Sequence, residues 1–545
     1  MKRAYSPKTN TDEISTASSI RPLKTNYLRM KKLYLTIIAL LGIISLSSAQ
    51  YVDNALLFSQ QSYGSTARSK AMGNAFGSLG GDFGSLSINP AGIGIYQRGE
   101  LSTTISLLNQ NNTETTYQGY SNSINNNKFN FNNFGYVSAI PTTSNTSGLV
   151  SLNFGLGYNR LANFNQNLFV GSASSPYSRM DAFAQNTNGI NFNDLVSTDT
   201  YDPYQNGIPW ESKMAWENYL IDLSNPGTGD NQYKTFLLPN EKVKQTEATN
   251  REGYNNEYIA TLGANFNHTL YLGATIGIQD LFYDEAKLYS EVGLNDAALN
   301  LKSWGQFDYS NNSRTSGIGY NLKIGAIFRP LPVLRIGVAI HTPTYFYMKE
   351  TYSSVMSSNL TGMTKTNANG SHREATPVGN YNYSFQAPMH AIGSVSYQFA
   401  KKGLVSLDYE LVDYTNMKYK NANDGYNFGT ENSDIKSVYK TVSNLRIGAE
   451  YRVTDAFSLR GGLEFLGNPY KTVVNNISQP NVDYKFKTYN GGIGYHMGNF
   501  SVDLTYSLGD KTNYMYLYRI DGVNVDPVKY HTLNSELLFT VAMRM

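Results

Sequence analysis

The chain of 545 residues contains no cysteine, which excludes disulfide bonds and thiolate metal sites. Charged residues make up only 16% of it, against roughly 25% in ordinary domains. The net charge of +3 is small for this length and implies no nucleic-acid partner. After Leu46 no run approaches the roughly 20 apolar residues that a membrane-spanning helix needs. Any crossing of a membrane must therefore be made by strands.

Motifs for catalysis or cofactor binding are also missing. The six histidines show no metal-binding spacing such as H-x-x-x-H, and no glycine-rich phosphate loop with its lysine occurs. We therefore expect no enzymatic activity, no cofactor and no metal. A lipase or protease of the outer membrane stays open as an alternative, because a serine–histidine–acid arrangement cannot be read from spacing.

Between Leu101 and Met545, strand-like stretches are joined by long polar connections and short turns in strict alternation. The long connections are 110–128, 165–255, 292–303, 353–379, 419–437, 468–481 and 511–529, and the short ones are 141–147, 267–269, 329–332, 401–403, 454–456 and 497–499. This alternation is typical of a transmembrane β-barrel. Seven long and six short connections predict an all-β fold of fourteen antiparallel strands, with both chain ends at the side of the turns.

The strands show the two-residue period that a barrel in lipid requires. Val405, Leu407, Tyr409 and Leu411 share one face of the segment 405–412, and Ser406, Asp408 and Glu410 share the other. The first face suits lipid and the second a polar lumen. The same phase places positive side chains in the lumen, namely Lys323, Arg335, Arg446, Arg452 and Arg460. These cations either form ion pairs with acidic residues that also face the lumen, or bind the acidic head group of a ligand.

Aromatic residues reach 13% of the chain and include 43 Tyr. Tyr suits the girdles at the two membrane interfaces, where its ring is apolar and its hydroxyl is hydrated. A soluble β-sandwich rich in Tyr is the alternative interpretation.

The N-terminal segment predicts export. A basic n-region at 30–32 with Lys31 and Lys32, an apolar core at 33–46 and the small residues Ser47 and Ala49 before Gln50 form a secretory signal peptide over 30–49. The polar residues 1–29 do not belong in front of such a signal, which indicates a start assigned too early or an extended presequence. We expect the mature chain to begin at Gln50.

Residues 50–98 form a plug candidate, because they show no strand alternation and are rich in Gly, which permits close backbone packing. The stretch Ala71–Tyr96, AMGNAFGSLGGDFGSLSINPAGIGIY, resembles the amino-terminal hatch of the FadL/TodX family of outer-membrane hydrophobic-compound transporters. The hatch motif that carries this resemblance is Asn89, Pro90, Ala91 and Gly92. Weaker similarity follows in the Gly and Tyr patterns of 334–343, 444–462 and 492–506.

The resemblance implies a fourteen-strand barrel at 99–545, blocked by the hatch at 50–98, in the outer membrane of a Gram-negative bacterium. Hydrophobic ligands would be captured outside and released sideways through an opening in the wall. The implied function is passive uptake of long-chain fatty acids or aromatic hydrocarbons. The protein would act as a monomer, with outer-membrane lipid and the barrel-assembly machinery as its other partners. Candidates for lining the ligand pocket are Phe76, Phe83, Ile88, Arg335 and Arg446.

Two features depart from the family pattern. The chain ends in Met545 where an aromatic residue is common, and the connection at about 165–255 is far longer than a simple loop. Within this insertion, apolar residues recur at helical spacing after Pro209, which predicts an amphipathic helix over 210–223. That helix either packs on the barrel rim or forms an exterior shelf where a ligand lands, with Trp210, Met214, Trp216 and Leu220 as candidates.

Two other functions stay open. Relatives of this kind include proteins labelled hemin receptors, and haem capture would favour an exterior His such as His372 in the connection 353–379. A structural surface barrel is the second alternative, although it would dispense with the hatch.

Overall fold

The computed structural model describes residues 45–63, 66–142, 148–227, 229–297, 300–399, 402–422, 424–474, 477–478 and 483–545. Leu46–Met545 forms one compact unit. Helix α2 (Ser45–Ser59) begins inside the expected signal peptide, and the remainder of that peptide and residues 1–29 lie outside the described residues. No helix in the described part of the chain is long and apolar enough to cross a membrane.

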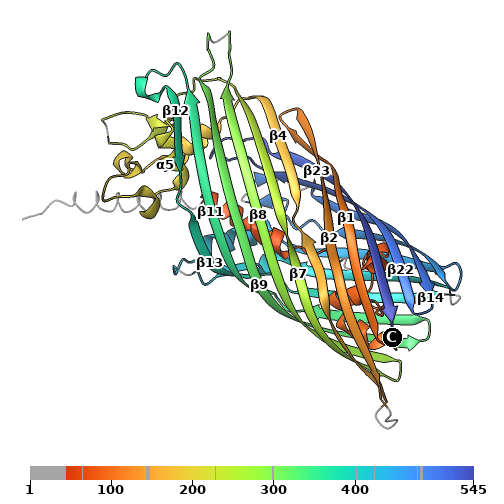
Figure 1. Cartoon of the computed structure of the whole chain (residues 1–545). Coiled ribbons are helices and arrows are strands. Elements are labelled where there is room, and N and C mark those ends of the chain that lie inside the picture. The colour runs from red at the N-terminus through yellow and green to blue at the C-terminus, as the bar shows by residue number, and fades with distance from the viewer. Residues whose placement is uncertain are drawn as a thin grey trace, which may run out of the picture. The chain divides into compact units, whose positions relative to one another are not determined.

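The barrel is one closed sheet of fourteen antiparallel staves (Figure 1). A stave here is one full crossing of the wall, made by a single strand or by two or three strands in line. Ten staves are single strands: β1 (Glu100–Tyr117), β2 (Tyr120–Pro141), β7 (Val243–Phe266), β8 (Leu270–Gly293), β9 (Gly305–Leu331), β17 (Thr441–Arg452), β18 (Phe457–Leu466), β21 (Lys485–Met497), β22 (Phe500–Met515) and β23 (Val528–Arg544). The other four are interrupted: β3 (Leu149–Asn163) with β4 (Gln166–Ser175), β10 (Leu334–His341) with β11 (Tyr345–Leu360), β12 (Gly370–Ala375) with β13 (Gly379–Gln386) and β14 (His390–Phe399), and β15 (Gly403–Asp413) with β16 (Lys418–Lys420). The first strand pairs with the last, from Glu100–Arg544 to Thr116–Lys529, so the sheet closes on itself. The predicted fourteen-stranded barrel is confirmed.

Proline marks three of the interruptions in the staves. Pro343 separates β10 from β11, Pro377 separates β12 from β13, and Pro388 separates β13 from β14. Proline has no N–H to donate to a neighbouring strand, so the ladder breaks where it occurs.

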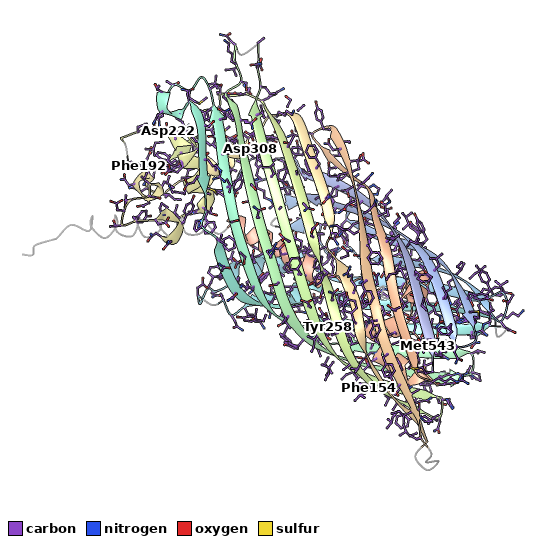
Figure 2. The ribbon with its side chains drawn as sticks, in the orientation of Figure 1. Phe154, Phe192, Asp222, Tyr258, Asp308 and Met543 are labelled. Carbon is purple, nitrogen blue, oxygen red and sulfur yellow. The ribbon has the colours of Figure 1, made fainter. Side chains whose placement is uncertain are left out.

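The wall shows the predicted division into a lipid face and a lumen face. On β15 the residues Val405 and Leu407 are about 40% exposed, whereas Ser406 and Asp408 between them are buried. Outward aromatic residues such as Tyr258 lie on the outside of the same wall (Figure 2). The alternation in sequence therefore reports the inside and outside of the barrel.

Several predicted turns match the structure, but the turn predicted at 329–332 falls at 332–333, because β9 continues to Leu331, and some predicted loops are wrong. Residues 267–269, 454–456 and 497–499 fall between strands or at their ends, as expected. The predicted loop 110–128 is wrong, because β1 and β2 continue through it to a tight turn at Gln118 and Gly119. Both faces of a strand can be polar where it rises beyond the lipid, so polar composition does not reveal the end of a strand there.

The N-terminal segment lies inside the barrel. It consists of α2, α3 (Ala67–Ala71), η1 (Phe83–Ser87) and η2 (Pro90–Ile95), and its apolar side chains are buried. Helix η2 packs against β7, β8 and β9, while α3 packs against β18, β21 and β22. The segment therefore reaches staves far apart in the sheet, which confirms a hatch in the lumen.

The long insertion folds into a cap at the loop end of the barrel. Strands β4 and β7 occupy both ends of the predicted insertion 165–255, so the residues between strands are 176–242. They form α4 (Arg179–Thr187), η3 (Phe192–Leu195), η4 (Pro203–Gln205), α5 (Trp210–Glu217), β5 (Asp222–Leu223) and β6 (Tyr233–Lys234). Phe192 and Asp222 mark this cap in Figure 2.

The predicted helix over 210–223 is too long. Helix α5 ends at Glu217, where the Asn218 side chain donates to the carbonyl of Met214 at 2.9 Å and Tyr219 adopts a φ of 55°. A left-handed residue directly after the C-cap ends a helix. The other short elements are η5 (Thr366–Ala368), η6 (Tyr414–Asn416), α6 (Gly429–Val438), β19 (Val473–Val474) and β20 (Ile477–Ser478).

Candidate functional site

An aromatic chamber surrounds helix α2 inside the barrel. Its wall residues come from staves and loops far apart in sequence: Phe164, Tyr283, Phe346, Tyr383, Phe385, Tyr414, Tyr419, Phe428, Tyr439, Tyr470 and Tyr484. All of them are buried. Lumen-facing positions at this level are therefore apolar or aromatic, unlike the polar lumen that the sequence predicts.

Helix α2 fills the chamber with its own apolar side chains. The Tyr51 ring makes edge contacts with Tyr383 and Tyr419, at centroid distances of 6.0 and 5.1 Å. Phe58 contacts Phe164 and Tyr283 at 6.1 and 5.7 Å. Aromatic pairs in this geometry attract one another beyond the burial of their area. An aromatic or aliphatic molecule would find the same partners here if the helix withdrew.

Few polar contacts hold α2 in the chamber. The hydroxyl of Tyr419 donates to the carbonyl of Tyr51 at 2.7 Å, and that of Tyr439 donates to the carbonyl of Val52 at 3.0 Å. Gln60 donates to the hydroxyl of Tyr484 at 3.0 Å. The contact is mainly apolar, so a hydrophobic ligand can compete for it without leaving many polar groups unpaired.

The Asn89 side chain joins the hatch to the wall. Its oxygen accepts from the backbone N–H of Ala91 at 3.0 Å and caps η2, in which Pro90 is the first residue. Its amide nitrogen donates to the carbonyl of Gly77 at 2.6 Å and lies 3.3 Å from the carbonyls of Ala326 and Val338. One side chain therefore holds two hatch segments against β9 and β10.

Glycines in the wall make room for the hatch. A Cβ at Gly157 would lie 2.3 Å from the Phe83 ring, and one at Gly135 would lie equally close. A Cβ at Gly273 would lie 2.3 Å from the carbonyl oxygen of Pro90. Because only glycine permits this approach, the Gly content of the inner wall records the position of the hatch.

Buried ion pairs connect the hatch to the lumen wall. Lys323 lies 2.6 Å from Glu257, and its ammonium also donates to the carbonyl of Ser87 at 3.3 Å. Arg68 of the hatch lies 3.0 Å from Glu450, which also accepts from Arg460 at 2.6 Å. Most of the inward cations are thus paired with wall carboxylates, in agreement with the first of the two interpretations.

Asp82 caps η1 within the hatch. Its carboxylate accepts from the backbone N–H of Gly84 at 2.9 Å and from the hydroxyl of Thr66 at 2.6 Å. Burial raises the pKa of Asp82, and the neighbouring Arg68 guanidinium acts in the opposite direction. These bonds keep the hatch compact around Arg68.

A seam without backbone pairing runs up the wall between β2 and β4. β3 pairs with β2 only from Asn133 to Pro141, and β4 pairs with β7. Between β2 and the β3–β4 break, side chains make the connection: Asn130 accepts from Arg160 at 2.6 Å and from Asn163 at 3.1 Å. Phe164 lies at the break and belongs to the chamber. The chamber therefore borders a part of the described wall that has no backbone pairing between β2 and β4.

The structure does not bring the predicted pocket residues together around one cavity. Phe76, Phe83 and Ile88 are at most 1% exposed and pack within the hatch or against the wall. Arg446 is fully buried and pairs with Glu410 at 2.5 Å and Glu464 at 2.8 Å. Only Arg335 borders an open cavity, at the turn end of the barrel.

The predicted exterior shelf is also corrected. Met214 and Leu220 are fully buried in the core of the cap and cannot receive a ligand from outside. The Trp210 ring lies 5.0 Å from Tyr352, and the Trp216 ring lies 6.1 Å from Tyr233. The apolar face of α5 packs on the barrel rim, which was the other interpretation of this helix.

His372 on β12 is held by local contacts. Its Nε2 lies 3.1 Å from the carbonyl of Ala368, and its ring lies 4.7 Å from that of Tyr219. Among the described residues, no group of His, Asp and Glu is arranged to hold a metal ion.

Sequence reasoning missed the aromatic chamber. Tyr and Phe at inward positions of neighbouring strands were the available signal, as in Tyr383 and Phe385 on β13 and Phe346 on β11. This pattern did not lead to a predicted chamber, because Tyr and Phe also form the lipid-facing girdles.

The chain is similar to a known protein family and to several solved structures. The sequence model of the family described as outer membrane protein transport protein (OMPP1/FadL/TodX) matches residues 242–515. The crystal structure of the Pseudomonas putida toluene transporter TodX is similar at 10% identity, over 89% of this chain and 99% of that one, with a TM-score of 0.47. A Pseudomonas aeruginosa FadL homologue shares 13% identity over 88% and 98% of the two chains, with a TM-score of 0.49.

A third solved structure, the deltaS2 mutant of the TodX monoaromatic hydrocarbon channel, shares 11% identity over 88% of this chain and 98% of that one, with a TM-score of 0.50. This likeness supports the barrel fold. No curated protein matches the chain.

Proposed function

The chain belongs to the outer membrane protein transport family, OMPP1/FadL/TodX, and from this we infer that it takes up hydrophobic compounds across the outer membrane of a Gram-negative bacterium. The aromatic chamber is the observation that carries the inference for this molecule. It is a cluster of buried aromatic side chains inside a barrel, packed around a helix with few polar contacts. Long-chain fatty acids and aromatic hydrocarbons such as toluene fit its chemistry.

Entry of the ligand displaces α2. Each CH₂ that leaves water contributes about 0.8 kcal/mol, so a compound of moderate length can replace the contacts that Leu56 and Phe58 make. The rest of the hatch, from α3 to η2, stays fixed by Asn89 and by Lys323, which pairs with Glu257 and donates to the carbonyl of Ser87. Because the hatch blocks the lumen, the ligand leaves sideways, past Phe164 and through the seam between β2 and β4.

The parts of the chain have separate roles in this proposal. Residues 50–98 act as the hatch and 99–545 as the barrel, while the cap at 176–242 limits access from outside. The cap crosses the mouth, since Gln185 exchanges two hydrogen bonds with Asp521 at 3.1 and 2.6 Å. The protein works as a monomer, inserted by the barrel-assembly machinery, and moves its ligand down a concentration gradient without a catalytic step.

A cross-link over the seam tests the route. The chain has no cysteine, so the double variant Asn130→Cys/Asn163→Cys carries the only two thiols. The native side chains lie 3.1 Å apart, within reach of a short bis-maleimide. We expect the reagent to abolish uptake of toluene and of a long-chain fatty acid into cells that express the variant.

The matched control places the same cross-link within a paired ladder. Asn359→Cys/Ser371→Cys joins residues that already face each other on β11 and β12, so its cross-link should leave uptake unchanged. Unchanged uptake after complete cross-linking at 130 and 163 would exclude the seam as the exit.

A further inference from the structure

A cavity of about 530 Å³ lies beneath the hatch at the turn end of the barrel. The turns at Pro332–Val333 and Gly498–Asn499 border it, and short turns of outer-membrane barrels face the periplasm. Its volume falls within the range of small-molecule sites. It is separate from the aromatic chamber, whose residues do not line it.

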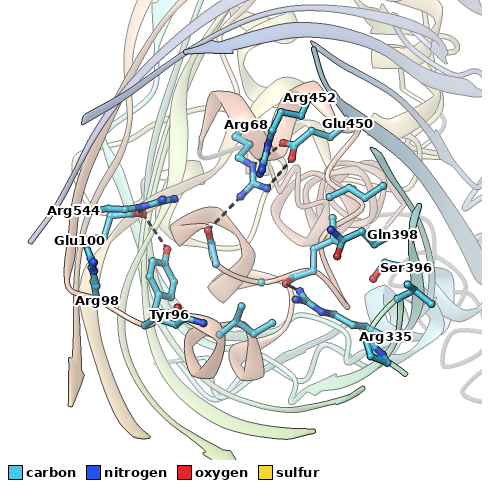
Figure 3. A pocket seen from close by; sticks show the side chains of 18 of the residues that line it. Arg68, Tyr96, Arg98, Glu100, Arg335, Ser396, Gln398, Glu450, Arg452 and Arg544 are labelled. Atoms are coloured by element: carbon cyan, nitrogen blue, oxygen red, sulfur yellow. Dashed lines mark hydrogen bonds and ion pairs between the residues drawn. The ribbon is translucent and has the colours of Figure 1, made fainter. Parts of the chain in front are cut away.

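The lining of this cavity carries an excess of guanidinium groups. Five arginines and two glutamates border it: Arg68, Arg98, Arg335, Arg452, Arg544, Glu100 and Glu450 (Figure 3). Glu450 is shared between Arg68 and Arg460, and Glu100 accepts from Arg544 at 3.3 Å. Both carboxylates are therefore already neutralised by cations.

Three guanidinium groups keep their charge without a carboxylate. Within the described part of the chain, Arg98, Arg335 and Arg452 have no ion-pair partner, and Arg335 donates instead to the carbonyl of Leu79 at 2.8 Å. Positive groups that line a cleft raise the local concentration of anions. A guanidinium also offers two parallel N–H donors that match a carboxylate or phosphate.

Apolar groups form the other part of the lining. Leu79 and Ile95 of the hatch and Val333 and Leu404 of the wall border the same space. A free inorganic anion would leave these groups without a partner. The combination fits an amphiphile, with a charged oxyanion head and a short apolar body.

We propose that this cavity binds an amphiphilic oxyanion, with its head group held by the unpaired guanidinium groups that line it, those of Arg98, Arg335 and Arg452, and its apolar body against the hatch. The head group is a carboxylate or a phosphate monoester, which share this chemistry. The proposed binding does not depend on transport. The identification of the occupant as a transported acid that reaches the periplasm does rest on the proposed function.

Calorimetric titration of the full chain in neutral maltoside micelles tests the site, with sodium octanoate, octyl phosphate and 1-octanol as probes and empty micelles as the blank. We expect octanoate to bind saturably, more tightly than 1-octanol, and more weakly as salt is raised. Octyl phosphate distinguishes the sources: tighter binding than octanoate assigns the site to a lipid phosphate, and weaker binding assigns it to a carboxylic acid.

The informative variant is Arg98→Gln/Arg452→Gln, which spares the Arg335 bond to the hatch. It should weaken octanoate binding about tenfold or more, because it removes two charge-assisted partners. The control Arg373→Gln/Arg519→Gln removes the same net charge at the loop end and should change nothing. If the double variant does not fold, as judged by its thermal transition, Arg452→Gln alone serves with a smaller expected loss.

Equal binding of octanoate and 1-octanol, or an equal loss in the test and control variants, would overturn the proposal. Toluene uptake measured in parallel reports on transport alone, because toluene carries no charge. Absent toluene uptake with arginine-dependent octanoate binding would leave the site standing and overturn the proposed function.

Discussion

The Lys323–Glu257 pair offers a direct measure of how firmly the hatch is held. The side chains are 1% and 0% exposed and their charged atoms lie 2.6 Å apart. Replacing Lys323 with Met leaves a buried carboxylate without its counter-charge, a change that typically costs about 3–5 kcal/mol. Ser87 still donates to Glu257 at 2.9 Å, and Gln279 and Asn321 donate at 3.4 Å. We therefore expect a loss near the lower end, about 3 kcal/mol.

The double variant Lys323→Met/Glu257→Met completes the cycle. With both charges removed, no ion is left unpaired, so the loss should fall well below the sum of the two single losses. The assay is the free energy of unfolding in urea, followed by tryptophan fluorescence of protein folded into lipid vesicles. A parallel recording in planar bilayers should show increased conductance for Lys323→Met, because its ammonium also holds the Ser87 carbonyl of the hatch.

An exposed pair in the same wall provides the matched control. Lys128 and Glu252 lie 2.8 Å apart with side chains 35% and 51% exposed, so Lys128→Met should cost about 0–1 kcal/mol. If Lys323→Met costs no more than Lys128→Met, the pair is hydrated and the account of the hatch anchor is wrong.

Three further outcomes follow from the same structure. Gly157→Ala places a methyl group 2.3 Å from the Phe83 ring and should destabilise the hatch by about 1–3 kcal/mol in urea unfolding, whereas Gly491→Ala, with no atom within 4 Å, should be neutral. Phe385→Ala opens the aromatic chamber and should weaken binding of naphthalene in a fluorescence titration at least tenfold; unchanged binding would place the ligand elsewhere. Affinity for fatty acids should rise with chain length, by about 0.8 kcal/mol per buried CH₂. Titration with haem should give no Soret shift that depends on His372, so the spectra of the native protein and of His372→Ala should be the same. The reverse pair of results would identify a haem receptor.

The sequence predicts which side chains of the wall face outward, because side chains that face lipid are apolar or aromatic. Val405, Leu407 and Tyr409 could be assigned to the outside, and Ser406 and Asp408 to the lumen, from their order alone. Where the strands leave the lipid this constraint ends, which is why residues 110–117 and 120–128 resembled a loop.

The interior was less accessible to such reasoning. The pairing of Arg446 with Glu410 and Glu464 depends on which strands are neighbours and on their register, and a single sequence does not give the register. Met214 shows the same limit: helical spacing revealed an apolar face, but only the fold shows that the face covers the barrel rim. A period in the sequence reports that a side chain is covered and leaves open what covers it.

The closing ladder between β1 and β23 makes the wall continuous around the hatch. The hatch precedes every described barrel strand in the chain, whereas Gly157 and Gly325, which make room for Phe83 and Asn89, lie on strands further along the sequence. The last strand must pair with the first before the cylinder is complete. The hatch therefore either is enclosed as the sheet closes around it or enters the finished cylinder through one end.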